Sequence, residues 1–564
     1  MRMTNKIMQN NSLYNINNNK ELQDKLSTQM STKKKISRPS DDPVIAIRAL
    51  RLRSDVSQIT QYYSKNAKDA ESWLKVTGDA LETTAEILKS MAGLCTQGAV
   101  KVFDASNVSI VVEQLKELKD EFYSTGNVDY AGRYMFTGYR TDTSLTFIEN
   151  LPENPNDPAY RKYSITEQLD ASAVDVVNYT QIGNLKGTTK DTYDPAADGV
   201  KEQEANIENH DIYRIRLSYD NIKYDPADAS TIPKITTISK ADRDTSIQNG
   251  TRPQETDLIS PALGNITVIS STVETDTTTN PPTTWSAQDY ITEWANKQTP
   301  PAEVAVLIPE TGELLISDAL YAKSFQKMDA DTEVRINYQK DNWKKGDMRP
   351  QHYFACDDIT DPDPAKAIKY NQAEDANGKY IPCERIKQNM EYDVGYNQRI
   401  CVNTNAHEVF TMDMDRNVDD LEQMLAELKE IEDIKTDLEN MLKGMDEGAA
   451  GYDNLKASYA AAEKAHAFIR ENAQKMFEGM ITKVQKISDF TSLAITDNGT
   501  RASRLDLISN RLMTQKSTFE TLQSANEDID VTEVTVQLTS MNYSYQSALL
   551  ATGKILQNSL MNYI

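Results

Sequence analysis

The chain has 564 residues, of which 39% are apolar and 26% charged, and its net charge at pH 7 is −24. The length predicts two to four domains, and the acidity argues against a nucleic-acid partner, which requires clustered Lys and Arg to contact phosphates. No apolar run approaches the roughly 20 residues that span a bilayer, so no membrane partner is expected. The charge is uneven: residues 1–60 hold eleven basic and five acidic side chains, whereas 413–450 hold four and thirteen. This asymmetry fits pairing between segments or subunits, although a solvated face is the commoner interpretation.

The first thirty residues predict a marginal helix. Its apolar residues recur at loose helical spacing among many Asn and Gln; they are Ile7, Leu13, Ile16, Leu22, Leu26 and Met30. A helix with so thin a stripe is unstable alone and forms against partners. The segment also lacks the apolar region and small-residue cleavage site of a Sec signal peptide.

The stretch SRPSDDPVIAIRAL (37–50) interrupts the helical pattern. Pro39 moves Arg38 out of the helical region, so the preceding helix should end by about residue 36. Asp42 is a favoured N-cap, and Pro43 fits the first helical position because its missing N–H would be unpaired there. The stretch therefore predicts a stop, an extended elbow and a strong new helix. A connection between two layers and an ordinary interhelical loop both explain it.

Heptad-like stripes follow the elbow and return near the C-terminus. The first stripe steps by three and four without a slip through Ala67, Ala70, Leu74, Thr77, Leu81, Thr84, Leu88, Met91 and Cys95, and Val111, Leu115, Leu118 and Phe122 repeat it. The C-terminal positions are Leu505, Ile508, Leu512, Gln515, Phe519 and Leu522, then Val534, Leu538, Met541, Tyr545 and Ala548, before a shift to Leu549, Leu556 and Leu560. Such stripes usually form core seams. The N- and C-terminal seams are expected to pair as an antiparallel coiled coil.

Between about residues 140 and 410 the helical period disappears. Short β-type runs appear at 210–222, 302–320 and 331–340, and the turn Glu310–Glu313 predicts a hairpin within the second run. The Thr- and Pro-rich stretch 272–286 predicts an exposed loop. The expected fold is mainly α at both termini, with antiparallel coiled-coil helical hairpins packed together and a large β-rich domain inserted in the middle.

The domain prediction follows from this plan. Residues 1–40 and 525–564 are expected to form inner terminal helices that are disordered in the monomer. Residues 41–140 and 411–524 should form a second helical layer. Residues 141–410 should form an outward-facing β-rich insert, with room for two subdomains.

No catalytic or cofactor motif is present. The four histidines, His210, His352, His407 and His466, are scattered, and there is no P-loop, G-x-S-x-G or G-x-G-x-x-G. A carboxylate-rich loop at Asp357, Asp358, Asp361 and Asp363 could hold Ca²⁺, but it lacks EF-hand spacing and is better explained as a solvated loop. We therefore predict no enzyme, metal or cofactor, and the insert is the one credible place for an activity.

The four cysteines fit neither a zinc site nor a CxxC motif. Cys95 falls in the first heptad stripe and is expected in a core. Cys356 and Cys383 either pair in an oxidising medium or stay free, and Cys401 has no assigned role.

Both ends resemble the flagellin superfamily of bacterial flagellar axial proteins. The resemblance lies in KKKISRPSDDPVIAIRALRLRSDVSQITQYYSKNAKDAESWL (33–74) and NEDIDVTEVTVQLTSMNYSYQSALLATGKILQNSLMNYI (526–564), and it covers roughly 1–140 and 500–564. ISRPSDDP and AGRYMFTGYRTDTSLTF (131–147) are similar to members that form the junction between the flagellar hook and filament.

The resemblance implies a structural, extracellular subunit that is exported unfolded by the flagellar type III apparatus. Its implied partners are further copies of itself, another hook-associated protein, flagellin and an export chaperone. The implied assembly residues are Ile7, Leu13, Ile16, Leu22, Leu26, Leu538, Met541, Tyr545, Leu549, Leu556 and Leu560, with Arg38, Pro39, Asp42 and Pro43 as the elbow motif. Two alternatives are a filament subunit and a flagellar adhesin or hydrolase that acts through the insert.

Overall fold

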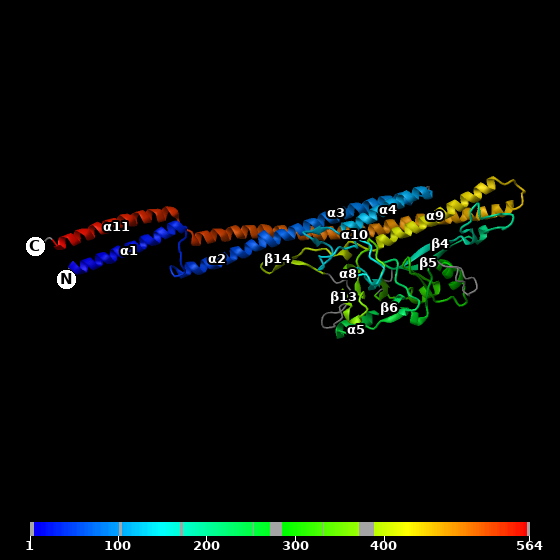
Figure 1. Cartoon of the computed structure of the whole chain (residues 1–564), viewed down its shortest axis with the longest axis horizontal. Coiled ribbons are helices and arrows are strands. Elements are labelled where there is room, and N and C mark those ends of the chain that lie inside the picture. The colour runs from blue at the N-terminus through cyan, green and yellow to red at the C-terminus, as the bar shows by residue number, and fades with distance from the viewer. Residues whose placement is uncertain are drawn as a thin grey trace. The chain divides into compact units, whose positions relative to one another are not determined.

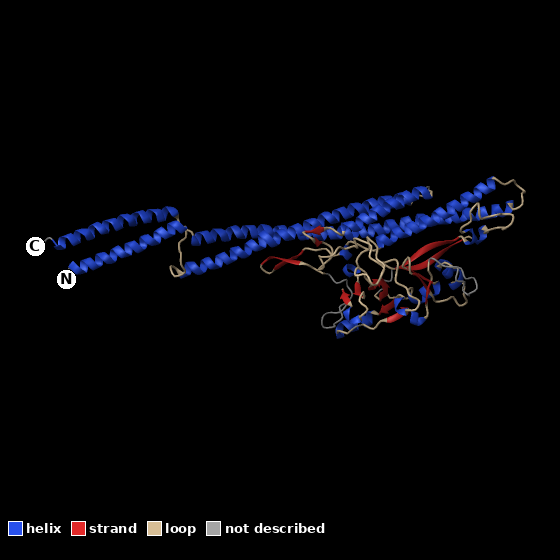
Figure 2. Ribbon diagram, in the orientation of Figure 1, coloured by secondary structure: helices blue, strands red, loops and turns tan. Residues whose placement is uncertain are grey.

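The computed structural model describes residues 5–100, 104–169, 173–251, 253–270, 285–329, 331–371 and 388–560. The chain divides into two compact units. The first, called the terminal unit here, comprises Met1–Ser72, Glu391–Cys401 and Arg501–Ile564. The second, called the insert-bearing unit, comprises Trp73–Met390 and Val402–Thr500. The terminal unit is helical apart from one β-hairpin, and the insert-bearing unit combines helices with β-sheets (Figures 1 and 2), which confirms the predicted fold class.

In the terminal unit, helices from the two ends of the sequence lie side by side (Figure 1). The helices of this unit are α1 (Asn5–Thr32), α2 (Pro43–Gln61), the π-helix η1 (Tyr62–Asn66), the start of α3 (Ala67–Gly98), the end of α10 (Tyr452–Glu527) and α11 (Val531–Leu560). The predicted pairing of the two ends is confirmed. A hairpin of β14 (Glu391–Gly395) and β15 (Gln398–Cys401) joins this unit, and Asn66 Nδ2 donates to Asp393 O at 2.7 Å.

The stripe predicted between Ala67 and Cys95 is the most buried helical face of the chain's N-terminal part. All nine of its positions are at most 2% exposed. The unbroken three-and-four spacing keeps every one of these side chains on the same side of α3. That prediction is confirmed, and Cys95 is a core residue whose burial raises the pKa of its thiol to about 12.

The stripe predicted near the end of α10 is confirmed only in part. Leu505, Ile508 and Leu512 are buried, but Gln515 and Leu522 are exposed. Beyond Leu512 the predicted Phe519 is half-buried, but Gln515 and Leu522 were wrong. The covered positions there are Lys516 and Gln523, one residue further along, because an ideal helix drifts relative to a strict seven-residue repeat.

The insert-bearing unit contains a bundle formed by most of α3, by α4 (Ala105–Thr125), by α9 (Asp413–Lys443) and by α10. Helices α4 and α9 are joined by ion pairs, Lys116 to Glu422 at 2.6 Å and Lys119 to Asp415 at 2.9 Å. The carboxylate of Glu432 on α9 accepts the N–H of Ala105 at the first turn of α4. Three of the acidic side chains of α9 thus stabilise its contact with α4.

Two sheets make up the insert. The five-stranded sheet has the order β4-β5-β10-β9-β8, with β4 (Val174–Gln181), β5 (Glu208–Arg216), β10 (Glu313–Ile316), β9 (Ala305–Ile308) and β8 (Ile266–Val268). The six-stranded sheet has the order β13-β12-β3-β11-β6-β7, with β13 (Ile368–Tyr370), β12 (Ala355–Asp358), β3 (Tyr163–Leu169), β11 (Glu333–Lys340), β6 (Lys234–Ile238) and β7 (Thr256–Ile259). All pairs are antiparallel except β8 with β9. Strands β1 (Asp129–Tyr130) and β2 (Arg133–Tyr134) form a separate small hairpin.

The predicted hairpin at Glu310–Glu313 is confirmed. Strands β9 and β10 pair antiparallel, and the connecting Gly312 has a φ of 65°, which favours glycine. The insert also has short helices that the sequence did not indicate: α5 (Lys240–Asn249), α6 (Ala287–Asp289), the π-helix η7 (Tyr290–Ala295), α7 (Asp318–Ser324) and α8 (Pro350–Tyr353). They are brief because local caps such as Ser239 and Ser317 start them without a long apolar stripe.

Each sheet has its own core. Beside the five-stranded sheet, Ile291, Val306 and Leu315 belong to one buried apolar cluster. In the other core the ring of Trp343 lies 5.1 Å from that of Phe147 and 5.3 Å from that of Tyr219. Two such clusters agree with an insert built from two parts.

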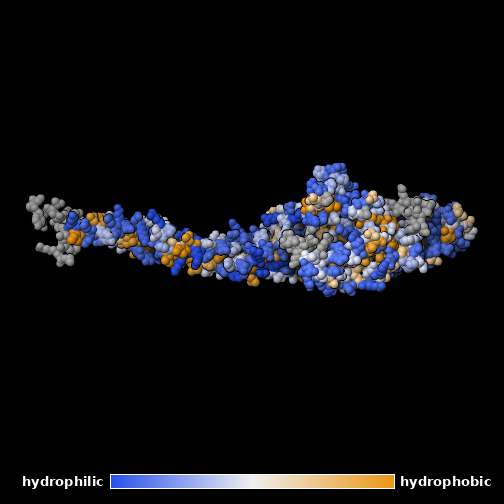
Figure 3. Space-filling model, turned by 90° about the horizontal axis from the view of Figure 1, so that it is seen from below, coloured by the Kyte–Doolittle hydropathy of each residue, from blue (hydrophilic) through white to orange (hydrophobic). Residues whose placement is uncertain are grey.

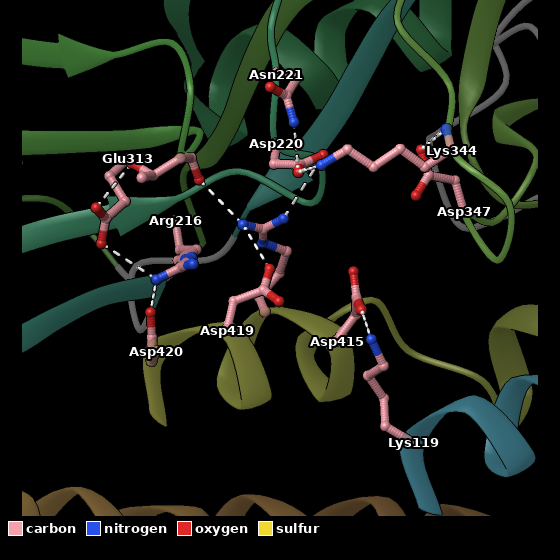
Figure 4. Close-up of polar contacts among 12 residues, drawn as sticks. Lys119, Arg216, Asp220, Asn221, Glu313, Lys344, Asp347, Asp415, Asp419 and Asp420 are labelled. Atoms are coloured by element: carbon pink, nitrogen blue, oxygen red, sulfur yellow. Dashed lines mark hydrogen bonds and ion pairs between the residues drawn. The ribbon is translucent and has the colours of Figure 1, made fainter. Parts of the chain in front are cut away.

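Buried ion pairs attach the insert to α9 (Figure 4). Arg214 on β5 contacts Glu313 at 2.6 Å and Asp420 at 2.9 Å, and Arg216 contacts the same two carboxylates. Burial lowers the pKa of Arg216 to about 10, while Arg214 and Arg216 outweigh the burial of Glu313 and hold its pKa at about 2. Removing one member of such a buried set leaves an uncompensated charge. The insert and α9 are therefore coupled by charge as well as by apolar packing.

The structure also bears on the residues considered for metal binding and disulfide formation. Among the described residues no group of His, Cys, Asp and Glu could hold a metal ion. Cys356 is free and buried on β12, whereas Cys383 and most of the predicted loop 272–286 lie outside the described residues. No helix in the described ranges is long and apolar enough to cross a membrane.

Candidate assembly surface

The elbow after α1 has the predicted construction. Asp42 caps α2, because its Oδ1 accepts the N–H groups of Val44 at 2.9 Å and Ile45 at 3.1 Å, and Pro43 occupies the first helical position. Asp41 Oδ2 accepts the N–H of Arg38 at 2.9 Å, which stabilises the extended part. The predictions for Pro39 and the restart at residue 43 are confirmed.

A second elbow, which sequence reasoning missed, lies between α10 and α11. Helix α10 ends at Glu527 and α11 starts at Val531, and Asp530 Oδ1 accepts the N–H groups of Thr532 and Glu533. Asp530 directly before the helix, with Glu533 three residues later, was the signal that could have located it. At both elbows the helix therefore ends and the next one starts after an aspartate, Asp42 or Asp530.

Backbone hydrogen bonds join the two elbows to each other. The N–H of Lys35 donates to Glu527 O at 2.7 Å, the N–H of Ile529 donates to Lys33 O at 3.2 Å, and Lys34 and Asp528 form an antiparallel bridge. Short antiparallel pairing of this kind fixes the register between the two segments, 33–35 and 527–529. It sets which residues of α1 face which residues of α11.

An ion cluster reinforces the joint. The side chain of Glu527 is buried and accepts two hydrogen bonds from the Arg53 guanidinium, at 2.8 and 2.6 Å, and it lies 3.4 Å from Lys34 Nζ. These contacts lower the pKa of Glu527, mainly through the hydrogen bond from Arg53. Bidentate Arg–carboxylate geometry is specific in direction as well as favourable.

The seam between α1 and α11 is half polar. The covered positions of α1 include Ser12, Ile16, Asn19, Gln23, Leu26 and Met30, and those of α11 include Val534, Leu538, Met541, Tyr545, Ala548 and Thr552. Gln23 Nε2 donates to Asn542 Oδ1 at 2.6 Å across the pair. Polar residues at seam positions specify register at a cost in stability. The helices α1 and α11, called the terminal pair here, therefore have a well-defined register but a weakly stabilising interface.

Helix α11 carries a second stripe on the side away from α1. Its positions are Val536, Ser540, Tyr543, Ser547 and Leu550, again at steps of three and four. Val536, Tyr543 and Leu550 are 65%, 68% and 70% exposed. We call these five residues the outer stripe. Figure 3 shows apolar side chains at the surface along the terminal helices. A heptad spacing on each of two faces is typical of a helix with neighbours on both sides.

The residues implied by the resemblance divide between these faces. Leu26 is buried, and Ile16, Leu538, Met541 and Tyr545 are half-buried, whereas Ile7, Leu13, Leu22 and Leu549 are exposed. Leu556 and Leu560 belong to α11, but their side chains lie outside the described residues. The exposed members, with the outer stripe, remain available to a neighbour. Sequence reasoning missed the outer stripe, although its spacing was visible.

A further apolar stripe lies on α2 just after the elbow. Val44, Ile47 and Leu50 are all more than half exposed, and Arg48 and Arg51 lie among them on the same exposed side. Clustered exposed aliphatic side chains next to arginines are characteristic of protein interfaces.

Residues 3–141 match the family model described as the bacterial flagellin N-terminal helical region. The N-terminal part of the chain is therefore similar to flagellin. The resemblance expected at the N-terminal end is confirmed, and the match includes the elbow, the α3 stripe and the segment 131–141.

Two curated relatives of this chain carry the same name, flagellar hook-associated protein 3. The protein from Salmonella typhimurium is 27% identical over 219 residues, which are 37% of this chain and 63% of the relative. The protein from Escherichia coli K12 is 26% identical over 181 residues, 32% of this chain and 55% of the relative. The chain thus spans less than two thirds of the length of either relative. A crystal structure of Xanthomonas campestris FlgL has a TM-score of 0.25 at 11% identity, covering 84% of this chain and 99% of that one.

Proposed function

We propose that this flagellin-like protein is a structural subunit of the bacterial flagellum that forms the junction between hook and filament. The observation that carries the proposal is the terminal pair: its elbows fix one register, its seam is weak, and the outer stripe stays exposed. The match of residues 3–141 to the flagellin helical region and the similarity to two hook-associated proteins support it. The segment 131–147 favours a junction subunit over a filament subunit.

The chemistry of the terminal pair supports assembly with further copies. Burying a Val or Leu side chain contributes roughly 1.5–3 kcal/mol relative to leaving it exposed. Tyr543, Leu550 and Val536 could therefore supply, on contact with a neighbouring helix, the stability that the polar seam between α1 and α11 lacks. The flanking serines are small enough to permit close helix approach.

The remaining partners follow from the same role. A junction subunit would contact another hook-associated protein on one side and flagellin on the other, and it would leave the cell through the flagellar export apparatus with a chaperone. The terminal helices 1–40 and 525–564 would form an inner layer, 41–140 and 411–524 a second layer, and 141–410 the outward-facing insert. This arrangement is extracellular and requires no catalytic centre.

The position of the protein on intact flagella tests the proposal. An antibody against residues 141–409 should place immunogold in a single cluster at the distal end of the hook. Gold along the whole filament would identify a filament subunit instead. Absence of gold from flagella would favour the adhesin or hydrolase that uses the insert.

Substitutions on the exposed side of α11 test the surface itself. Tyr543→Asp and Leu549→Asp should each leave the monomer folded and exported, because both side chains are exposed, and both variants should fail to join a flagellum. Leu263→Asp is the matched control, since Leu263 is equally exposed on the insert, and it should assemble normally. Assembly of the α11 variants at the wild-type level would contradict the assigned surface.

A further inference from the structure

A cleft of about 890 Å³ lies within the insert-bearing unit. It is bounded by residues 167–169 of β3, by Arg214 and Arg216 of β5, by the first turns of α9 and by residues 483–497 of α10. Small-molecule sites generally measure roughly 300–1,000 Å³. Neither the terminal pair nor the proposed junction role uses this space.

One wall of the cleft is apolar and uncovered. It is formed by α10, where Phe490 and Leu493 line the cleft and are 43% and 68% exposed, next to the buried Ile487. Tyr353 and Phe354 add aromatic surface from the insert. Large apolar side chains that remain exposed together in a concave site mark a place where a ligand can cover them.

The side of the cleft formed by β5 and α9 is polar and rich in donors. Arg214, Arg216 and Arg416 line it, and the Nε atom of each is buried without a hydrogen-bond partner among the described residues. The hydroxyl of Thr411, another lining residue, is in the same state. Buried polar groups are nearly always paired, with protein or with a bound molecule. These four atoms are closed to solvent, so a ligand in the cleft would instead meet the exposed polar side chains of its lining, such as Lys486 and Asp413.

The charges around the cleft nearly cancel. Five cationic side chains line it (Arg214, Arg216, Arg416, Lys483 and Lys486), against five carboxylates (Asp175, Glu408, Asp413, Asp420 and Asp497). A sixth carboxyl group, Glu167, is buried, and burial raises its pKa to about 7. A strongly anionic or cationic ligand would gain little from such a lining. Hydroxyl groups, which both donate and accept, match it better.

We propose that this cleft binds a short neutral oligosaccharide, with a sugar ring stacked on Phe490 and hydroxyl groups directed at the arginine and carboxylate wall. A sugar presents C–H groups on its ring faces and hydroxyl groups around its edge, so it complements one apolar and one polar wall at once. The site gives the insert a recognition role of its own. It stands independently of the junction function, because no residue of the terminal unit contributes to it.

Binding of defined trisaccharides to the full-length monomer tests the inference. Maltotriose, cellotriose and chitotriose serve as neutral probes and trigalacturonate as the charged one, measured by saturation-transfer NMR and titration calorimetry. At least one neutral trisaccharide should bind. Phe490→Ala should weaken that binding about tenfold, or about 1.4 kcal/mol. Leu507→Ala is the matched control, since Leu507 is an exposed residue of the same helix outside the cleft, and it should bind as wild type does.

The contrary results are equally clear. Failure of all three neutral trisaccharides to bind would overturn the proposal, as would equal affinity of Phe490→Ala and wild type. Tighter binding of trigalacturonate than of any neutral probe would overturn the neutral class. Because Phe490 is partly exposed, its replacement should leave the thermal unfolding of the monomer unchanged, so that a binding loss reports on the site.

Discussion

Helix α3 and the terminal pair α1–α11 use the same heptad spacing with opposite results. The α3 stripe from Ala67 to Cys95 is buried at every position, whereas the α1 seam has one buried apolar residue, Leu26, and mixes half-buried apolar and polar side chains elsewhere. Burial of a continuous apolar stripe stabilises a helix through tertiary packing, and a polar seam specifies register without supplying much stability. The difference teaches that α3 is completed within its own chain, while the terminal pair is prepared for completion by a neighbour.

The largest expected effect comes from a cavity in the α3 stripe. Leu81 is fully buried, so Leu81→Ala should lower the free energy of unfolding by about 2–5 kcal/mol. Denaturant unfolding of the monomer measures it. Leu50→Ala is the control, because Leu50 is exposed on α2. Similar losses for both variants would remove the contrast between covered and uncovered stripes.

The next effect concerns pH and the interior of the insert. Glu167 is buried, and its pKa is raised to about 7 in the folded protein, mainly by desolvation. The folded state therefore binds a proton more tightly than the unfolded state, so this contribution to stability is complete below about pH 4.5 and is lost as the pH rises through 7.

Glu167→Gln should remove that dependence and raise the stability at pH 8 by about 3 kcal/mol. Urea unfolding of the insert-bearing unit at pH 5 and pH 8 compares the two proteins. A variant that retains the full pH dependence would exclude Glu167 as the group responsible.

A smaller effect is expected at the joint of the two elbows. Glu527→Gln keeps the shape of the side chain but removes the charge that faces Arg53 and Lys34. Since both cations are partly exposed, the loss should be no more than about 1 kcal/mol. Hydrogen exchange of the amides of Lys35 and Ile529, which bond across the joint, reports it directly. The difference from wild type should shrink in 1 M salt.

The smallest effect on the monomer should come from the exposed side of α1. Leu13→Ser replaces an exposed residue and should change the free energy of unfolding by less than about 0.5 kcal/mol. Incorporation into flagella should nevertheless fall if the terminal pair is completed by a neighbour. Normal incorporation would limit the assembly surface to α11.

The parts of the fold that the sequence predicted are those with local causes. The α3 stripe follows from spacing alone, and the elbow follows from what Asp42 and Pro43 do to the backbone around them. The side of α11 that meets α1 was predicted correctly as far as Ala548. Beyond it the register fixed at the elbows places Thr552 on the seam and leaves Leu549 exposed.

Long-range features could not be predicted from spacing. The strand orders of the two sheets join segments far apart in sequence. The arginines on β5 show no periodic signal that would pair them with Glu313 or Asp420. The cleft beside Phe490 depends on the same distant packing, so its lining residues had no common motif. Such contacts arise only once the chain has folded.

The hairpin β14–β15 carries a lesson for protein engineering. Its residues, Glu391–Cys401, lie within the predicted insert 141–410 but belong to the terminal unit, where Asn66 Nδ2 donates to Asp393 O. A foreign domain grafted in place of residues 141–409 would therefore also remove part of the terminal unit. A graft that keeps residues 391–401 would leave the terminal unit complete, so residues 141–409 cannot be exchanged as one continuous segment.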